Sequence, residues 1–577
     1  MRKRTGWLVL LGLTLVFTSL FTPAQTAANK KNDNANYHKR WVEKTMNDMT
    51  LDEKIGQMFM VGFQNESGPA YEVNEQAETM INEYHVGGII LFTRNVDTPS
   101  QVAGLTNALQ ELAWEKENQI PLMVTADQEG GRVIRIEKDT TIFPGSMALG
   151  ATRSEDLAYE AGQVTGTELQ AMGINANLAP SLDVNNNPDN PVIGVRSFGE
   201  DPDLVADLGT ANIQGFQEAG VLATAKHFPG HGDTDVDSHI GLPSIPYDME
   251  RLREVELVPF KRAIDQGVDM IMSAHITFPE IDDTPGLPGT LSEPVLTGIL
   301  REELGFDGVI ITDDMEMAAI VDNFGAEEAA VKSIQAGTDI VLVSHRLDRQ
   351  KASIEAVKEA VASGDISKER IDASVERILK AKAKKTTGKP MIRTPFVNET
   401  HVPKNVGTED HQQAAAEIAR QAITLVQDND DRLPVDATQT EDAFVVSAEN
   451  ADAFGKAIEA HGVKTTVQST GTQPSESEVT EIVQAAAGHD LVVVGTSSQE
   501  HGKLVEALET SGSNVIIVGL DTPYDLRGFP DASTYLAAYG YQPASLEAAA
   551  ASIFGDIDPE GQLPVTIPGL YEYGHPK

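Results

Sequence analysis

The sequence predicts a (β/α)8 TIM-like barrel followed by a smaller α/β sandwich domain. Three observations support this fold class. Eight short apolar runs recur in the first two thirds of the chain, with amphipathic segments between them. Charged residues repeatedly follow these runs, and a second α/β pattern begins after a stretch rich in Pro and Thr. A chain of 577 residues is also too long for one hydrophobic core, so two or more domains are expected.

The N-terminus is expected to be a signal peptide over residues 1–28. Basic residues at positions 2–4 precede an apolar run from Trp7 to Phe21, and small residues precede a cleavage point after Ala28. An uncleaved anchor is disfavoured because the run is short for a span of about 20 residues. Residues 29–40 are expected to form a flexible leader. We therefore expect a protein that is secreted, extracellular or associated with the cell wall, without stable membrane insertion.

The barrel is predicted over residues 41–385. Buried parallel strands read as continuous apolar runs, and each parallel connection needs a crossover, usually a helix. Eight such units predict a closed barrel. An open doubly wound sheet is the alternative, but no G-x-G-x-x-G follows the first run. The eight runs occupy residues 55–63, 86–92, 120–128, 174–184, 220–228, 268–276, 306–314 and 336–344.

A linker and a second domain are predicted after the barrel. Residues 386–410 are rich in Pro, Thr and Asn and have little periodicity, which indicates an interdomain linker. Residues 411–577 are predicted to form the α/β sandwich domain. Its expected strands include residues 442–448, 490–497, 514–521 and 534–540.

The composition restricts the partners and the chemistry. Lys plus Arg number 44 against 87 Asp plus Glu, a formal charge of −43, which repels nucleic acids and anionic membranes. We expect no nucleic-acid partner. The charge also suits a saline or alkaline habitat, although an ordinary acidic secreted protein would look similar. The chain has no cysteine, which excludes disulfides, thiol nucleophiles, thiolate metal sites and a lipid-modified N-terminal cysteine.

Charged side chains recur at the C-terminal ends of the predicted strands. This is the face on which barrel enzymes hold their active sites. The alternative is that strand ends are loops and that loops are polar, but the repetition over successive strands favours a shared site. The residues concerned are Asp127, Asp183, Lys226, His227, His275 and Asp313.

The segment KHFPGHGDTDVDSH, residues 226–239, first suggests a metal site. His227 and His231 have H-x3-H spacing, but Pro229 and Gly230 between them break a helix. A calcium loop would need glycine at its sixth position, where this chain has Ser238. The sequence therefore predicts no metal and no cofactor.

The same segment also suits proton transfer. Asp237 and His239 are two residues apart, so on an extended segment their side chains point the same way, and the carboxylate can hold the imidazole. An incidental pair in a solvated loop has the same spacing. Asp313, at the end of the seventh run, is placed as a nucleophile would be. A helix N-cap is the alternative there, and the neighbouring Asp314 could take that role.

Several motifs together closely resemble glycoside hydrolase family 3. They are KHFPGHGDTDVDSH (226–239), DQEGGRV (127–133), RSFGEDP (196–202), MSAH (272–275) and ITDDMEM (311–317). Within that family, the chain is similar to the two-domain β-N-acetylglucosaminidases of Gram-positive bacteria. The resemblance extends from about residue 38 to the end of the chain.

The resemblance implies roles for individual residues. Asp313 would be the nucleophile of a retaining enzyme, and His239 would be the acid/base, polarised by its dyad partner Asp237. The sugar-binding residues would be Asp127, Arg196, Lys226, His227 and His275, with Arg132 as a further candidate. For Arg196 and Lys226, an ion pair at the barrel rim is the structural alternative.

The resemblance also implies an activity. We expect removal of N-acetylglucosamine (GlcNAc) from the non-reducing end of muropeptides, with chitin oligosaccharides as alternative substrates, by a protein that is a monomer. Three alternatives stay open: phosphate as acceptor, another family 3 β-glycosidase activity, and substrate-assisted cleavage steered by Asp313 and Asp314. From another class, a non-catalytic sugar-binding wall protein is the rival.

Overall fold

The computed structural model describes residues 23–386, 389–390 and 392–576. Most of the expected signal peptide therefore lies outside the described residues. Within the described part of the chain, no helix is long and apolar enough to cross a membrane. Residues 29–40 are not the expected flexible leader, because they belong to helix α1 (Pro23–Asp48). No Gly or Pro interrupts this helix after its first residue, and Tyr37 and Trp41 pack against the barrel core.

Eight parallel strands form the barrel. Each lies inside one of the eight predicted runs, and neighbours in sequence are neighbours in the sheet, with β1 also paired to β8. A parallel bridge between Ile311 and Ile340 joins the two remaining edges. The strands are β1 (Phe59–Val61), β2 (Gly88–Ile90), β3 (Met123–Ala126), β4 (Ala176–Asn177), β5 (Leu222–Phe228), β6 (Met270–Ser273), β7 (Val309–Thr312) and β8 (Val341–Val343).

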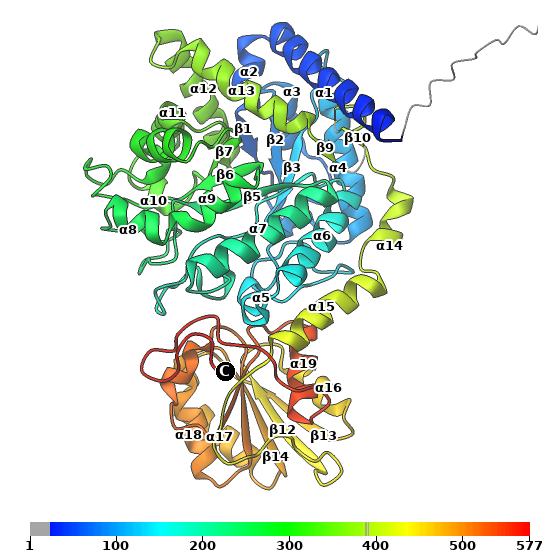
Figure 1. Ribbon diagram of the computed structural model, residues 1–577, viewed down its shortest axis with the longest axis vertical. Helices are drawn as coiled ribbons and strands as arrows, with labels where there is room; N and C mark the ends of the chain where they lie inside the picture. Colours follow the sequence, from blue (N-terminus) through cyan, green and yellow to red (C-terminus); the bar gives the residue numbers. More distant parts are fainter. Residues whose placement is uncertain (1–22, 387–388, 391, 577) are drawn as a thin grey trace, which may run out of the picture.

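Helices surround this sheet (Figure 1). Several begin at side-chain caps, as at α7, where Asp201 accepts the Leu204 N–H at 2.9 Å and Pro202 opens the helix. The helices are α2 (Leu51–Gln57), α3 (Glu75–Asn82), α4 (Pro99–Trp114), α5 (Ser146–Thr152), α6 (Glu155–Ala171), α7 (Pro202–Ala219), α8 (Met249–Glu254), α9 (Leu257–Asp265), a π-helix (Pro294–Glu303), α10 (Ala318–Val321), α11 (Ala326–Ala336), α12 (Leu347–Ser363) and α13 (Lys368–Ala383).

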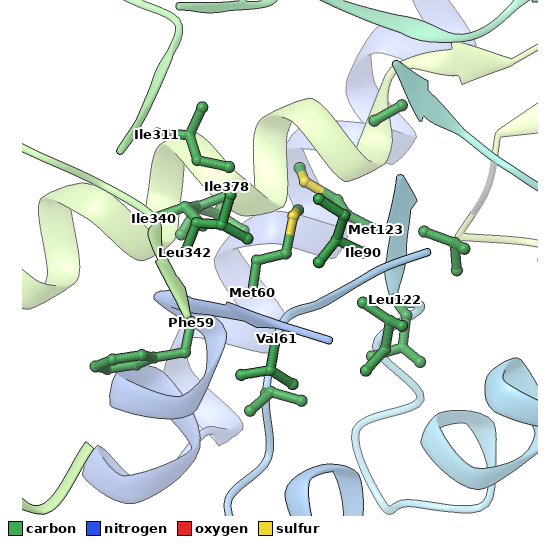
Figure 2. Packing of buried hydrophobic residues seen from close by; sticks show 14 of the residues in the cluster. Phe59, Met60, Val61, Ile90, Leu122, Met123, Ile311, Ile340, Leu342 and Ile378 are labelled. Carbon is green, nitrogen blue, oxygen red and sulfur yellow. The ribbon is translucent and has the colours of Figure 1, made fainter. Parts of the chain in front are cut away.

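Apolar side chains fill the barrel interior. Figure 2 shows Met60, Ile90, Met123 and Leu342 from four strands close together, with Ile378 of α13 beside them. All are at most 2% exposed. Because the interior is packed, a ligand can bind only at an end of the barrel.

The second domain contains a six-stranded sheet in the order β11-β16-β15-β14-β12-β13, in which only the β11–β16 pair is antiparallel. The four predicted strands are present. The strands β11 and β13 were not predicted, because each lies at an edge of the sheet and neither is a continuous apolar run. The strands are β11 (Thr424–Asp428), β12 (Asp442–Ser447), β13 (Lys464–Ser469), β14 (Leu491–Thr496), β15 (Val515–Gly519) and β16 (Thr534–Ala537). The helices are α16 (Ala451–Glu459), α17 (Glu476–Ala486), α18 (Gly502–Thr510) and α19 (Pro543–Ile553).

Between the domains, the chain forms β9 (Lys385–Thr386), β10 (Lys389–Pro390), α14 (Val402–Asn405) and α15 (Glu409–Ala422), and the last two run along one side of the molecule (Figure 1). The second domain contacts loops that follow the barrel strands. Asn185 donates to the Tyr524 hydroxyl at 2.9 Å, and Gln542 donates to the Gly131 carbonyl at 2.7 Å. These contacts place it at the C-terminal face of the barrel.

Candidate active site

A cavity of about 640 Å³ opens at the C-terminal ends of the barrel strands. This volume is typical of small-molecule sites. All its lining residues belong to the barrel, between positions 90 and 349, and the described part of the second domain contributes none. Six of the predicted site residues line it: Asp127, Arg196, Lys226, His227, His239 and Asp313.

A buried ion-pair network forms one wall. Lys226 lies 2.9 Å from Asp127 and 2.7 Å from Glu129, and Arg196 donates two hydrogen bonds to Glu129, at 2.8 and 2.9 Å. The Glu129 side chain is 3% exposed. Burial alone would raise the pKa of its carboxyl, but the charges of Arg196 and Lys226 outweigh burial and hold it well below its ordinary value.

Sequence reasoning missed Glu129, although it lies two residues after Asp127 in the same motif. Arg196 and Lys226 do form ion pairs, as the structural alternative predicted, and their partner is Glu129. Both residues also line the cavity. The pairing fixes the two cations where their remaining donors can reach a bound polar ligand.

Arg132 does not line the cavity. Its side chain is 52% exposed and lies 4.0 Å from Asp521 of the second domain. Arg135 lies in the cavity wall instead and donates to Asp127 at 3.3 Å. The turn at Gly130 and Gly131, both with positive φ, redirects the chain, so the predicted arginine faces away and the one three residues later faces in.

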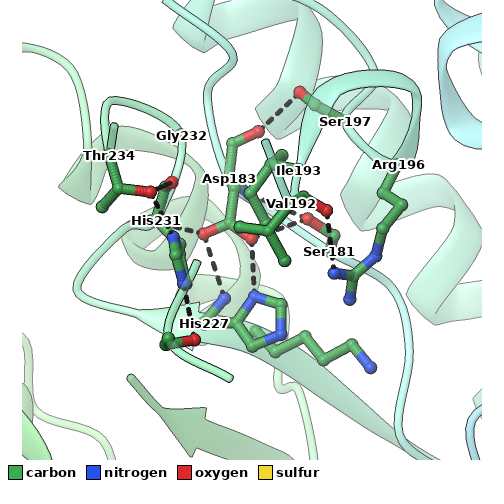
Figure 3. A network of polar contacts seen from close by, with 12 residues as sticks. Ser181, Asp183, Val192, Ile193, Arg196, Ser197, His227, His231, Gly232 and Thr234 are labelled. Atoms are coloured by element: carbon green, nitrogen blue, oxygen red, sulfur yellow. Dashed lines mark hydrogen bonds and ion pairs between the residues drawn. The ribbon is translucent and has the colours of Figure 1, made fainter. Parts of the chain in front are cut away.

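Asp183 organises the floor of the cavity (Figure 3). Its carboxylate accepts the His227 ring at 2.7 Å, the His227 N–H at 3.1 Å, the His231 N–H at 2.7 Å and the Ser181 hydroxyl at 2.8 Å. Burial opposes ionisation, but the His227 interactions outweigh it and lower the pKa of Asp183. Since the carboxylate is ionised, His227 Nδ1 carries the proton and Nε2 is left as an acceptor.

Asp313 follows β7 directly and lines the cavity. Burial raises its pKa, but nearby His227 and His275 outweigh that effect, so the pKa lies below its ordinary value and the group is an ionised carboxylate at neutral pH. Asp314 does not act as a helix N-cap, since Met317 holds that position for α10. Asp314 accepts the N–H groups of Glu316 and Ser344, at 3.1 and 3.2 Å, and Asp313 accepts the Asp314 N–H at 2.8 Å. Both carboxylates line the cavity.

His275 is fully buried and does not line the cavity, contrary to the predicted sugar contact. Its Nδ1 lies 2.9 Å from the Thr290 hydroxyl, and its Nε2 donates to the Asp314 carbonyl at 3.0 Å. Burial lowers its pKa. Because both ring nitrogens are engaged within the protein, the residue supports the backbone beside Asp313.

The Asp237–His239 pair has the predicted contact. Asp237 accepts the His239 ring Nδ1 at 2.8 Å and the His239 N–H at 2.9 Å. The His239 side chain is 62% exposed and reaches the cavity. Burial raises the pKa of Asp237, but the hydrogen bonds from His239 outweigh it and lower the value. The ionised carboxylate therefore fixes the Nδ1 proton and leaves Nε2 to exchange protons in the cavity.

The histidines of the 226–239 segment contact other protein groups. Within the described part of the chain, no group of three or more His, Asp or Glu side chains is arranged to hold a metal ion. The histidines of the 226–239 segment are instead bonded to Asp183, Thr234, Ser238 and Asp237.

Comparisons with known proteins identify the family of this chain. The family model for the glycosyl hydrolase family 3 N terminal domain matches residues 50–381, so the chain belongs to glycosyl hydrolase family 3 and is a glycoside hydrolase. Its relatives include β-hexosaminidase A of Pseudoalteromonas piscicida, 32% identical over 90% of this chain and 97% of that protein. A second relative is the β-N-acetylglucosaminidase/β-glucosidase of Cellulomonas fimi, 29% identical over 91% of this chain and 95% of that protein.

A solved structure extends the likeness to both domains. The family 3 β-N-acetylglucosaminidase from Paenibacillus sp. str. FPU-7 is 41% identical to this chain, with a TM-score of 0.82. The match covers 90% of this chain and 99% of that one. The barrel with its sandwich domain is thus the architecture that this chain shares with that solved structure.

Proposed function

We propose that this protein is an exo-acting, retaining β-N-acetylglucosaminidase that releases GlcNAc from the non-reducing ends of peptidoglycan fragments. One observation carries the proposal: an ionised Asp313 and His239 line the same cavity, and Asp237 holds the His239 ring. The packed barrel interior closes this cavity from below. The names of the relatives support GlcNAc as the sugar that is released.

The chemistry follows from the positions of these groups. Asp313 attacks the anomeric carbon while protonated His239 gives its Nε2 proton to the departing glycosidic oxygen, which leaves a covalent glycosyl ester on Asp313. In the second step, neutral His239 takes a proton from water as that water attacks the anomeric carbon and releases Asp313. Asp127, Arg196 and Lys226 hold the sugar hydroxyls throughout.

Turnover of an aryl β-N-acetylglucosaminide tests this mechanism. Asp313→Ala should abolish activity, and His239→Ala and Asp237→Ala should lower kcat/KM by about 10²–10⁴-fold on a substrate with a poor leaving group. Asp235→Ala is the matched control, since Asp235 is an exposed acid of the same loop. Full activity in Asp313→Ala would disprove the mechanism.

A fluorosugar inhibitor separates the covalent route from substrate-assisted cleavage. The inhibitor should be a 5-fluoro GlcNAc glycosyl fluoride, which keeps the 2-acetamido group, and its attachment to Asp313, found by peptide mass spectrometry, supports the retaining ester mechanism. Turnover of this compound with no adduct on Asp313 would favour assistance by the acetamido group.

The acceptor and the natural substrate need a product assay. Muropeptides and chitobiose should be compared with and without phosphate, because His239 carries no negative charge when it acts as the base and would not repel a phosphate anion. We propose water as the acceptor, so GlcNAc should be the product in both conditions. Formation of a sugar 1-phosphate would reassign the enzyme as a phosphorylase.

We further propose that the protein is exported and works outside the cell or at the cell wall, as a monomer. Support comes from the basic and apolar pattern of residues 1–28. N-terminal sequencing of the protein from culture medium should begin at Asn29. Recovery of the intact N-terminus in the membrane fraction would contradict this.

A further inference from the structure

The loop that carries Asp237 and His239 begins at a fixed point. His231 is 2% exposed, and its N–H donates to Asp183 at 2.7 Å, the same carboxylate that orients His227. The next residue, Gly232, lies so close to the Val184 carbonyl that a Cβ atom there would be 1.7 Å from it. The start of the loop is therefore held against the floor of the cavity.

The contacts of the His231 ring assign its proton. The Thr234 hydroxyl donates to the His231 carbonyl at 3.1 Å, so it accepts from the ring Nδ1 at 2.7 Å. With the proton on Nδ1, the ring Nε2 is an acceptor. The Ser238 hydroxyl, 3.1 Å away, must then donate to it.

Ser238 lies between the two members of the acid/base pair and is 2% exposed. The other hydrogen bonds of residues 235–241 run from the N–H groups of His239, Ile240 and Gly241, and from the His239 ring, to Asp237, all within the segment itself. Among the described residues, the Ser238–His231 bond is thus the hydrogen bond that ties this segment to the barrel.

We propose that Ser238 and His231 are positioning residues whose hydrogen bond holds the Asp237–His239 pair over the cavity in reach of the departing oxygen. This inference rests on the proposed function, because it assigns these two residues to the acid step of that reaction. Without the bond, the pair stays intact but its distance from the glycosidic oxygen is no longer set.

The test exploits the leaving group. A phenyl β-N-acetylglucosaminide needs a proton on the departing oxygen, whereas a 2,4-dinitrophenyl glycoside departs without one. Ser238→Ala should lower kcat/KM about tenfold for the phenyl substrate and less than about threefold for the dinitrophenyl substrate. The tenfold loss is smaller than the 10²–10⁴-fold that a general acid contributes, because the acid is displaced and not removed. Ser244→Ala is the matched control, because Ser244 is an exposed serine of the same connection. That control should match the wild type on both substrates.

A double-mutant cycle tests the partner. His231→Phe removes the ring acceptor, so adding Ser238→Ala to it should cost no further activity on the phenyl substrate. An equal loss on both substrates, a Ser238→Ala variant that behaves like the control, or additive losses in the cycle would overturn the proposal. Should Ser238→Ala not fold, Ser238→Cys decides by the same ratio, because a thiol is similar in size and a weaker donor.

The outcomes also separate this inference from the proposed function. If the wild-type protein hydrolyses neither substrate, or Asp313→Ala retains activity, the proposed function fails. Suppose instead that the wild type is active and that His239→Ala loses much more kcat/KM on the phenyl substrate than on the dinitrophenyl substrate. If Ser238→Ala shows no such difference between the substrates, only the positioning role fails.

Discussion

Glu129 illustrates how single residues build the site. A carboxylate that is 3% exposed is unfavourable unless it is paired, and here Arg196 and Lys226 both contact it. The two cations in turn depend on Glu129, because without it they would lie buried next to one another. Together with Asp127, which also contacts Lys226, these residues form a network of two carboxylates and two cations.

Replacing this charge should destabilise the protein and impair catalysis. Glu129→Gln leaves two buried cations with too little negative charge, so the free energy of unfolding should fall by about 3–5 kcal/mol. Misplacement of Lys226 and Arg196 should lower kcat/KM about 100-fold. Urea unfolding and kinetics measure both, with the exposed Glu137→Gln as control. Wild-type stability in Glu129→Gln would contradict the network.

The stabilisation by Glu129 depends on pH with a definite sign. Its folded pKa lies below the ordinary 4.5, so its contribution is fully present above pH 4.5 and is lost as the pH falls toward the folded pKa. The difference in stability between wild type and Glu129→Gln should accordingly shrink on acidification below pH 4.5. A difference that grows there would argue against a depressed pKa.

At the scale of elements, helix α13 packs across the N-terminal ends of the barrel strands and buries a lysine near its own C-terminal end. Lys382 is 0% exposed and donates to the Gln57 side chain at 2.7 Å and to the Gly87 carbonyl at 2.8 Å. No carboxylate pairs with it among the described residues. Burial therefore lowers its pKa to about 7.

This lysine should make stability rise with pH. Between about pH 7 and 10.5, the unfolded chain keeps the Lys382 proton while the folded protein has lost it, so the unfolded state binds more protons and stability increases. Wild type should gain up to about 1.4 kcal/mol per pH unit there relative to Lys382→Met. Urea unfolding from pH 7 to 10 measures this, with exposed Lys380→Met as control. Parallel pH profiles for wild type and Lys382→Met would refute it.

At the scale of the whole molecule, the excess of acidic residues sets the response to salt. A formal charge of −43 makes the folded protein repel itself, and salt screens that repulsion. The melting temperature should therefore rise by about 5 °C between 0.02 and 0.5 M NaCl. Low concentrations of sodium thiocyanate should raise the melting temperature by a similar amount, because screening depends on ionic strength and not on the identity of the anion. A flat or falling melting temperature in NaCl would exclude self-repulsion as an important effect.

The second domain supports the site without lining it. The second domain contacts the barrel through Asn185–Tyr524 and Gly131–Gln542, yet its described residues leave the cavity lining to the barrel. Its contacts instead fix loops that follow β3 and β4. In the proposed mechanism, the acid/base pair of Asp237 and His239 accordingly comes from the barrel, as does the rest of the site.

Local patterns in the sequence determined much of this protein. Eight apolar runs predicted eight strands, because a strand buried on both faces needs continuous apolar residues. The two-residue spacing of Asp237 and His239 predicted their contact, and the position of Asp313 after its run placed it at the C-terminal face. The strands β11 and β13 lacked such a pattern and were not predicted.

Only the tertiary structure decided which polar side chains face the cavity. Lys226 meets Asp127 across 99 positions in the sequence and Arg196 meets Glu129 across 67, so no local pattern reveals either contact. The turn at Gly130 and Gly131 brought Arg135 into the wall and turned Arg132 toward the second domain, and the neighbouring strands buried His275 against the Asp314 carbonyl. The physical reason is that the sequence specifies which segments become strands, whereas the direction of a side chain beyond a strand end depends on turns and on the neighbouring strands that surround it.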